Sequence, residues 1–75
     1  MQTTPTEIQI IRLPEVIRRT GLSRSTVFAR IRPNPRRPGD FDKDFPKPIQ
    51  LGARAIGWYS AEITAWLESR HAKRA

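Results

Sequence analysis

Cysteine is absent from the 75 residues, and histidine and methionine each occur once. Without cysteine the chain forms no disulfide, no thiolate zinc site and no thiol nucleophile. The single histidine, His71, is too little for a His-rich metal site and argues against His-based catalysis. No pair of carboxylates falls on a shared helical face either. We therefore expect neither an enzyme nor a bound metal or other cofactor.

Long apolar runs are also missing, because none exceeds three residues. A membrane-spanning helix needs about 20 apolar residues, so no transmembrane segment is expected. The first six residues lack the basic and apolar regions of a signal peptide, which predicts a cytoplasmic chain. We expect residues 1–7 to be disordered, residues 8–70 to form one small domain, and residues 71–75 to be a basic tail.

Positive charge is what the chain has in excess. Fourteen Lys and Arg residues against seven Asp and Glu residues give a net charge of +7. The excess is densest in residues 1–32, which carry six arginines and two glutamates. Such a field favours a polyanionic partner, with nucleic acid first and an anionic membrane surface second. A basic surface that only serves solubility is the alternative.

The first third of the chain predicts a short strand or extended arm, followed by a short helix. Residues 8–13 are rich in β-branched side chains. Pro14 suits the first turn of a helix, where its missing N–H has no consequence. Gly21 suits the left-handed position that ends a helix. These signals predict a helix over residues 14–20.

The next segment predicts a second helix from residue 24 to residue 31 or 32. Ser23 can cap the free N–H groups of its first turn. Leu22 and Val27 have the spacing of a hydrophobic staple, which fixes the angle at which the chain enters the helix. Pro33 ends the helix, because the residue before a proline is disfavoured in helical conformation.

The remainder predicts a loop, a hairpin and a last helix. Residues 33–44 show no periodicity and carry three prolines, so they are expected to form a long loop. Two short apolar segments, 49–51 and 55–58, flank a Gly-Ala-Arg tip at residues 52–54 and predict a β-hairpin. Ser60 is expected to cap the last helix.

Two tryptophans, Trp58 and Trp66, are expected in the core rather than as platforms for stacking bases. A domain of this size needs the apolar area that only large side chains provide. The element order predicts a fold that is mainly α-helical with a small β-hairpin.

The two helices within residues 14–32 have the pattern of a helix-turn-helix. A glycine-containing turn joins them, and the second helix is available for a DNA major groove. Helical periodicity turns Val27 and Ile31 toward the core and leaves the opposite side to Ser25, Ala29 and Arg32. This geometry predicts that the start and the outer face of the second helix contact DNA.

The residue types on these surfaces suit nucleic acid. Arg24 can bond two acceptors on guanine, and Phe28 either contacts a thymine methyl group or closes the edge of the core. Arg54, at the hairpin tip, can hold a phosphate or enter the minor groove. Arg18 and Arg19 are expected on a solvated face, with phosphate contact as the alternative. The candidate DNA-contacting residues are Ser23, Arg24, Ser25, Thr26, Phe28, Arg30, Arg32, Lys47 and Arg54.

Several segments together resemble the AlpA-type phage and prophage regulators, which are small winged-helix proteins related to excisionases and to the DNA-binding part of MerR-type regulators. The matching motifs are I-R-L-P-E-V, T-G-L-S-R-S-T-V-F, F-P-K-P-I-Q-L-G, R-A-I-G-W, S-A-E-I and A-W-L, at residues 11–16, 20–28, 45–52, 54–58, 60–63 and 65–67. They extend over about residues 8–70 and are specific in combination.

The resemblance implies a winged helix-turn-helix that binds double-stranded DNA, with the second helix in the major groove and the hairpin as a wing beside it. It also implies a regulator of transcription, an excisionase, or both, at the nucleoid of a bacterial or phage-infected cell. Relatives commonly pass from the second helix to F-P-K-P within a few residues. The longer link at residues 33–44 is either passive or adds a contact through Arg36 and Arg37.

A protein-interaction module is the alternative function, with an integrase or another regulator as partner and residues 68–75 as the candidate surface. One small domain reads few base pairs, so we also expect several copies to bind cooperatively on repeated sites. The chain has no coiled-coil heptads that would make it a constitutive dimer.

Overall fold

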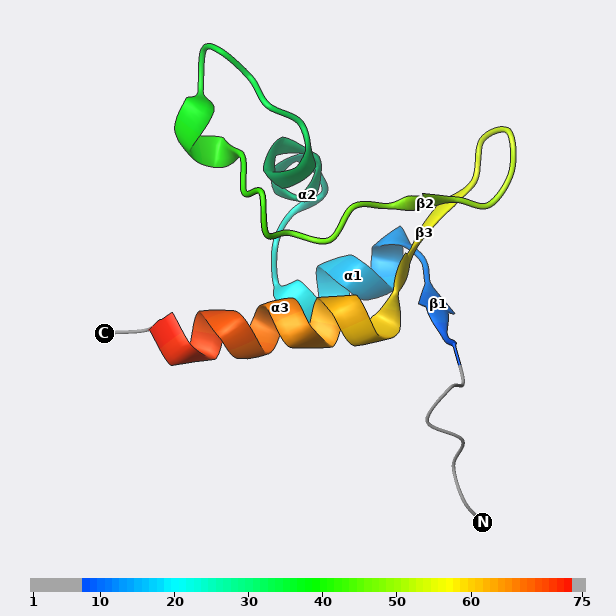
Figure 1. The fold of residues 1–75 in the computed structure, drawn as a ribbon. Helices are drawn as coiled ribbons and strands as arrows, with labels where there is room; N and C mark the ends of the chain where they lie inside the picture. Colours follow the sequence, from blue (N-terminus) through cyan, green and yellow to red (C-terminus); the bar gives the residue numbers. More distant parts are fainter. Residues whose placement is uncertain (1–7, 74–75) are drawn as a thin grey trace.

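The structure is a computed structural model that describes residues 8–73, so the expectation for residues 1–7 lies outside the described residues. The described chain folds into three helices, one 3-10 turn and three short strands (Figure 1). None of its helices is long and apolar enough to cross a bilayer. The elements are β1 (Ile10–Ile11), α1 (Leu13–Thr20), α2 (Arg24–Ile31), η1 (Pro38–Asp40), β2 (Ile49–Gln50), β3 (Ile56–Tyr59) and α3 (Ser60–Lys73).

Helices α1 and α2 form where their local signals predict them. Gly21 adopts the left-handed conformation at φ 73° and closes α1, its N–H donating to the carbonyl of Ile17 at 2.9 Å. Ser23 caps α2, its hydroxyl oxygen accepting the backbone N–H of Thr26 at 3.2 Å. The helix ends at Ile31, two residues before the proline. The predicted helix-turn-helix is therefore confirmed.

A small antiparallel sheet brings strand β1, near the start of the described chain, onto the hairpin that precedes α3. Strand β3 lies in the centre, with β1 on one side and β2 on the other. The hairpin of β2 and β3 is confirmed, and Leu51 N–H donates to the carbonyl of Ala55 at 2.7 Å, which closes the loop at the hairpin tip. The segment at residues 8–13 contributes the strand β1 rather than a free arm, since Ile10 pairs with Tyr59 and Ile11 with Trp58.

One core connects the helices to the sheet. Its buried members in the described residues are apolar, and every helix contributes at least one of them. Leu13, Ile17, Leu22 and Ile31 pack against its edge. This arrangement confirms that α1 and α2 bury the faces that periodicity assigns to them. The buried side chains are Ile11, Val16, Val27, Phe45, Trp58, Ile63 and Trp66.

Both tryptophans lie in this core, as predicted, and both use their indole N–H. Trp58 Nε1 donates to the carbonyl of Pro46 at 3.1 Å, and Trp66 Nε1 donates to Asp42 Oδ2 at 3.1 Å. Phe45 meets Trp66 edge to face, with ring centroids 4.8 Å apart. The returning segment at residues 42–46 is therefore fixed on the core by both indoles.

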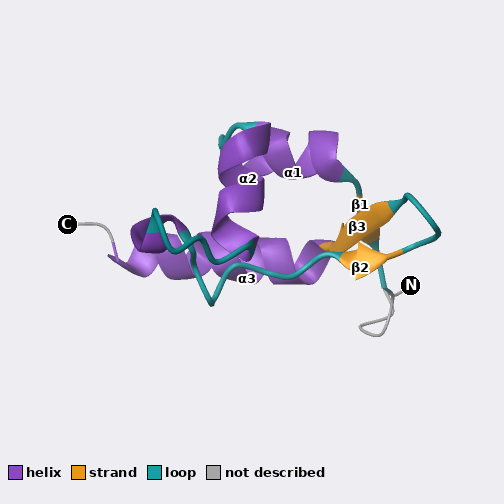
Figure 2. Cartoon of the chain, turned by 90° about the horizontal axis from the view of Figure 1, so that it is seen from above, coloured by secondary structure: helices purple, strands orange, loops and turns teal. Residues whose placement is uncertain are grey.

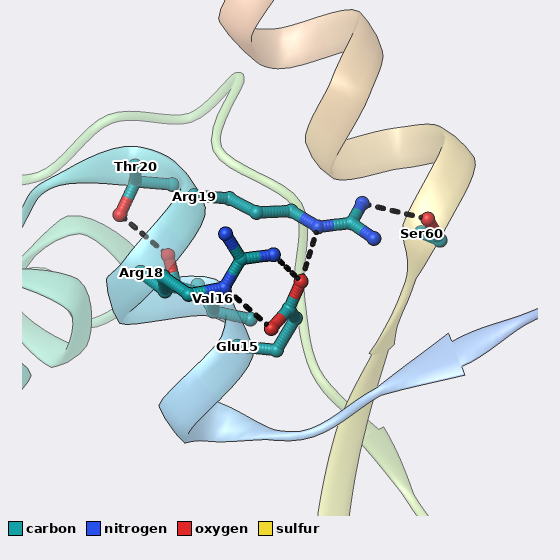
Figure 3. Close-up of polar contacts among 6 residues, drawn as sticks. All are labelled: Glu15, Val16, Arg18, Arg19, Thr20 and Ser60. Carbon is teal, nitrogen blue, oxygen red and sulfur yellow. Dashed lines mark hydrogen bonds and ion pairs between the residues drawn. The ribbon is translucent and has the colours of Figure 1, made fainter.

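A polar bridge ties α1 to the start of α3 (Figure 3). Arg19 Nε donates to Glu15 at 2.9 Å, and its Nη1 donates to the Ser60 hydroxyl at 2.8 Å. The Ser60 hydroxyl, which was predicted to cap α3, thus accepts a hydrogen bond from Arg19. Arg18 also bonds Glu15, and the hydrogen bonds from these two arginines lower the Glu15 pKa to about 2. Arg19 therefore connects α1 to α3 and does not lie on a solvated face.

Helix α3 continues as far as Lys73. Residues 71–73 of the expected basic tail are thus helical, and the boundary at residue 71 stays a prediction.

Candidate nucleic-acid interface

Helix α2 lies between two projecting segments. The β2–β3 hairpin projects on one side of α2, and the loop that contains η1 lies on the other (Figures 1 and 2). The buried face of α2 holds Val27, whereas Ser23, Arg24, Ser25 and Arg32 are exposed. The surface that α2 offers to a partner is thus flanked on both sides.

The flank toward the hairpin is a groove of about 400 Å³ that we call the arginine groove. Its walls come from the start of α1 and the segment before it, from α2, from the hairpin tip and from Ile56, and four arginines are among its lining residues. Among its lining residues there is no acidic side chain, so its charge is uncompensated within the groove. The residues are Arg12, Leu13, Pro14, Arg24, Phe28, Arg32, Ala53, Arg54 and Ile56.

Phe28 forms the floor between two of these arginines. The Cζ atoms of Arg24 and Arg32 lie 5.6 Å and 5.4 Å from the centroid of its ring. A guanidinium at this distance is attracted to the ring face. Phe28 is half-buried and lines the groove, and the choice between base contact and core packing stays open.

Arg12 is the arginine of the groove that was not among the predicted DNA contacts. Its Nε donates to the carbonyl of Ile56 at 2.9 Å, which holds the guanidinium against the hairpin. Arg12 reaches the hairpin because β1 pairs with β3. Its proximity to Ile56 depends on that pairing between distant segments. The I-R-L-P-E-V motif, which contains Arg12, was the sequence signal that could have indicated this residue.

The other flank of α2 is a groove of about 310 Å³. Ser25, Thr26, Ala29 and Arg30 line it from α2, and Arg37 and Asp40 line it from the loop. Arg30 Nη1 donates to the carbonyl of Asp40 at 3.0 Å, so this side chain holds the loop in place. The face that periodicity leaves open is therefore bordered by residues 37–40.

Three other predicted contacts, Ser23, Thr26 and Lys47, have different surroundings. Ser23 Oγ donates to Thr26 Oγ1 at 2.9 Å while it caps α2, so both hydroxyls already have partners within the helix. Lys47 is exposed, but it lines a separate groove between residues 43–47 and α3. The structure brings Arg24, Phe28, Arg32 and Arg54 together and leaves Lys47 outside that group.

The helix-turn-helix of α1 and α2 with the β2–β3 hairpin beside it defines a small winged helix-turn-helix domain of the DNA-binding type. Comparison with known families makes the assignment specific. The chain belongs to the family described as prophage CP4-57 regulatory protein (AlpA), whose model matches residues 9–71. The family resemblance of the sequence is thereby confirmed.

Two curated relatives extend this comparison. The chain is 43% identical over 63 residues to the DNA-binding transcriptional activator AlpA of Escherichia coli K12, covering 84% of this chain and 86% of that protein. It is 36% identical over 69 residues to the uncharacterized protein ORF88 of Enterobacteria phage P4, covering 92% of this chain and 68% of that protein. No solved structure matches the chain.

Proposed function

We propose that this chain is a sequence-specific DNA-binding regulator that places α2 in the major groove and the hairpin tip on the adjacent backbone or minor groove. The arginine groove carries the proposal, because four arginines line it beside the exposed start of α2. Double-stranded DNA presents a matching array of phosphates. The name of the similar Escherichia coli protein supports both DNA binding and control of transcription.

The arginines divide into a base-reading group and a backbone group. Arg24 lies in the first turn of α2, the part of a recognition helix that reaches base edges, and can bond O6 and N7 of one guanine. Arg12, Arg32 and Arg54 line the walls of the groove and are assigned to phosphates. The free backbone N–H groups at the start of α2 supplement them.

Arg24 and Arg54 provide the test. A binding site is first selected from a random duplex library, and affinities are then measured for that site and for single base-pair changes in it. Arg24→Ala is expected to cost about 1–3 kcal/mol and to relax the preference at one base pair. Arg54→Ala is expected to weaken all sequences alike, because phosphate contacts carry no sequence information.

Lys43→Ala is the matched control, because it removes an exposed charge from the separate groove beside α3. Circular dichroism verifies that each variant is folded. The proposal is wrong if Arg24→Ala and Arg54→Ala bind the selected site as the unchanged chain does.

Excision is the second candidate output of the same DNA contact, and it rests on the family resemblance. Footprinting across an attachment site and an integrase promoter distinguishes the outputs. Protection of the promoter alone supports regulation, whereas protection of the attachment site together with stimulated recombination supports an excisionase with an integrase as partner. Cooperative protection of repeated sites tests the proposal that several copies bind together.

A further inference from the structure

We propose that residues 33–44 form a second backbone-binding arm, in which Arg36 and Arg37 contact phosphates on the side of α2 opposite the hairpin. This inference rests on the proposed function, since it needs α2 to lie in a DNA groove. The arm, meaning residues 33–44, lies beside α2 on the flank away from the hairpin (Figures 1 and 2).

The arm is attached to the domain at several points. The guanidinium of Arg30 donates to the carbonyl of Asp40 at 3.0 Å, and the carbonyl of Arg30 accepts the N–H of Asp42 at 2.9 Å. Asp42 then accepts the indole N–H of Trp66 and lies 3.7 Å from Arg70 Nη1. An arm held to both α2 and α3 keeps its position without DNA.

The tip of the arm also has a defined shape. Asn34 Oδ1 accepts the N–H of Arg36 at 3.0 Å, and the carbonyl of Asn34 accepts the N–H of Arg37 at 2.9 Å. Pro33, Pro35, Pro38 and Phe41 line one small hollow, and the fixed φ of each proline restricts the backbone. A chain already restricted in this way loses less conformational entropy when it binds.

The charged side chains of the arm have different surroundings. Arg36 and Arg37 are exposed, and within the described residues neither forms an ion pair. Asp42, Lys43 and Asp44 lie on the α3 side, whereas Asp40 lines the groove beside α2 together with Arg37. Arg37, which lines the groove beside α2, and its exposed neighbour Arg36 are therefore the cations that the arm offers to a partner of α2.

This arrangement matches the shape of a duplex. A helix in the major groove has a sugar–phosphate backbone on each side, and the groove is about 12 Å wide. Arg54 at the hairpin tip contacts one sugar–phosphate backbone, and Arg36 and Arg37 on the arm contact the other. The length of residues 33–44 thus has a function beyond linking α2 to β2.

Salt titration tests the arm directly. The logarithm of the association constant for the selected duplex is measured against the logarithm of the salt concentration. Each phosphate contact contributes about −0.9 to the slope. Arg36→Ala and Arg37→Ala are each expected to reduce the steepness by about 0.9, and the double variant by about 1.8. Discrimination between matched and mismatched sites is expected to stay unchanged.

Lys43→Ala is again the control for the loss of one exposed charge, because Lys43 belongs to the same arm but lines the groove beside α3 and not the groove beside α2. Ethylation interference identifies which phosphates are contacted. The double variant is expected to lose interference at one set of phosphates, and Arg54→Ala is expected to lose it at a different set. A double variant with the slope of the unchanged chain overturns the inference, as does an equal effect of Lys43→Ala. If the proposed function itself fails, the unchanged chain binds duplex without salt dependence and Arg54→Ala has no effect either.

Discussion

Two neighbouring arginines on α1 share one carboxylate and differ in what they contribute. Arg18 and Arg19 both bond Glu15, but their side chains are 71% and 28% exposed. Arg19 alone continues to the hydroxyl of Ser60 on α3. Exposed ion pairs contribute little to stability, whereas a partly buried hydrogen bond between two elements contributes more.

Arg19→Ala is therefore expected to lower the free energy of unfolding by about 0.5–1.5 kcal/mol through loss of the bond to Ser60. Arg18→Ala removes the same charge from the same helix and is expected to have a smaller effect. Denaturant unfolding followed by the fluorescence of the buried tryptophans measures both. Equal losses in the two variants would show that the bridge to α3 contributes nothing.

Sequence reasoning predicts site residues well where their position depends on local structure. Arg24 and Phe28 follow from the cap and period of one helix, and Arg54 follows from a short hairpin. Arg12 was missed because its contact with Ile56 spans 44 positions and exists only through strand pairing. Arg30 was expected to contact DNA, and its bond to Asp40 depends on the path of the loop.

At the scale of the element, the end of α1 depends on one backbone conformation. Gly21 has φ 73°, and a Cβ added there meets nothing within 4 Å. Any cost of a side chain is therefore conformational and not steric. Gly21→Ala is expected to destabilise the domain by about 1 kcal/mol, because L-residues disfavour this region.

Gly39→Ala is the matched control, because a Cβ there also meets nothing within 4 Å and its φ is not in the left-handed region. It is expected to leave stability unchanged or slightly raised. Thermal unfolding by circular dichroism compares the two. A loss in Gly39→Ala equal to that in Gly21→Ala would contradict the assignment of the cost to the left-handed cap.

The attachment of the arm to the core depends on the ionisation of Asp42. Burial of this carboxyl raises its pKa, but hydrogen bonds from Asp44 N–H and Trp66 and the charges of Arg70 and Arg30 outweigh burial and lower the pKa below its ordinary value. A lowered pKa in the folded state stabilises the fold above the ordinary value of about 3.9. That stability is lost as the pH falls through the folded pKa.

Asp42→Asn is accordingly expected to unfold at a lower temperature than the unchanged chain between about pH 5 and pH 7. The difference is expected to narrow as the pH falls below about 3.9. Melting temperatures of both proteins over this range measure it. A difference that stays constant down to the acid limit would show that the charge of Asp42 is irrelevant.

The same contrast between local and long-range signals holds for whole elements. Both helices of the helix-turn-helix and the hairpin were predicted because caps, glycines and prolines mark their ends. The sequence alone did not decide whether residues 8–13 form a strand or an extended arm. The partner strand β3 lies far along the chain, since Ile11 pairs with Trp58, 47 positions later. The attachment of residues 33–44 likewise depends on contacts with α2 and α3 that no local pattern encodes.

At the scale of the whole molecule, the positive charge is divided by position. Part of it is structural, as in Arg19 and Arg30, and part lies at the arginine groove and on the arm. The cations assigned to phosphates flank α2 on both sides, and Arg24 between them is assigned to a base. They are Arg12, Arg32, Arg36, Arg37 and Arg54.

The salt dependence of duplex binding tests most directly whether the arginines on the two sides of α2 contact phosphates. With about five phosphate contacts, the logarithm of the association constant is expected to fall against the logarithm of the salt concentration with a slope near −4.5. Arg54→Ala is expected to bring the slope to about −3.6, whereas Lys43→Ala is expected to leave it near −4.5. Binding that is indifferent to salt between about 50 and 200 mM would contradict the account of α2 and its two flanks as a DNA-binding surface.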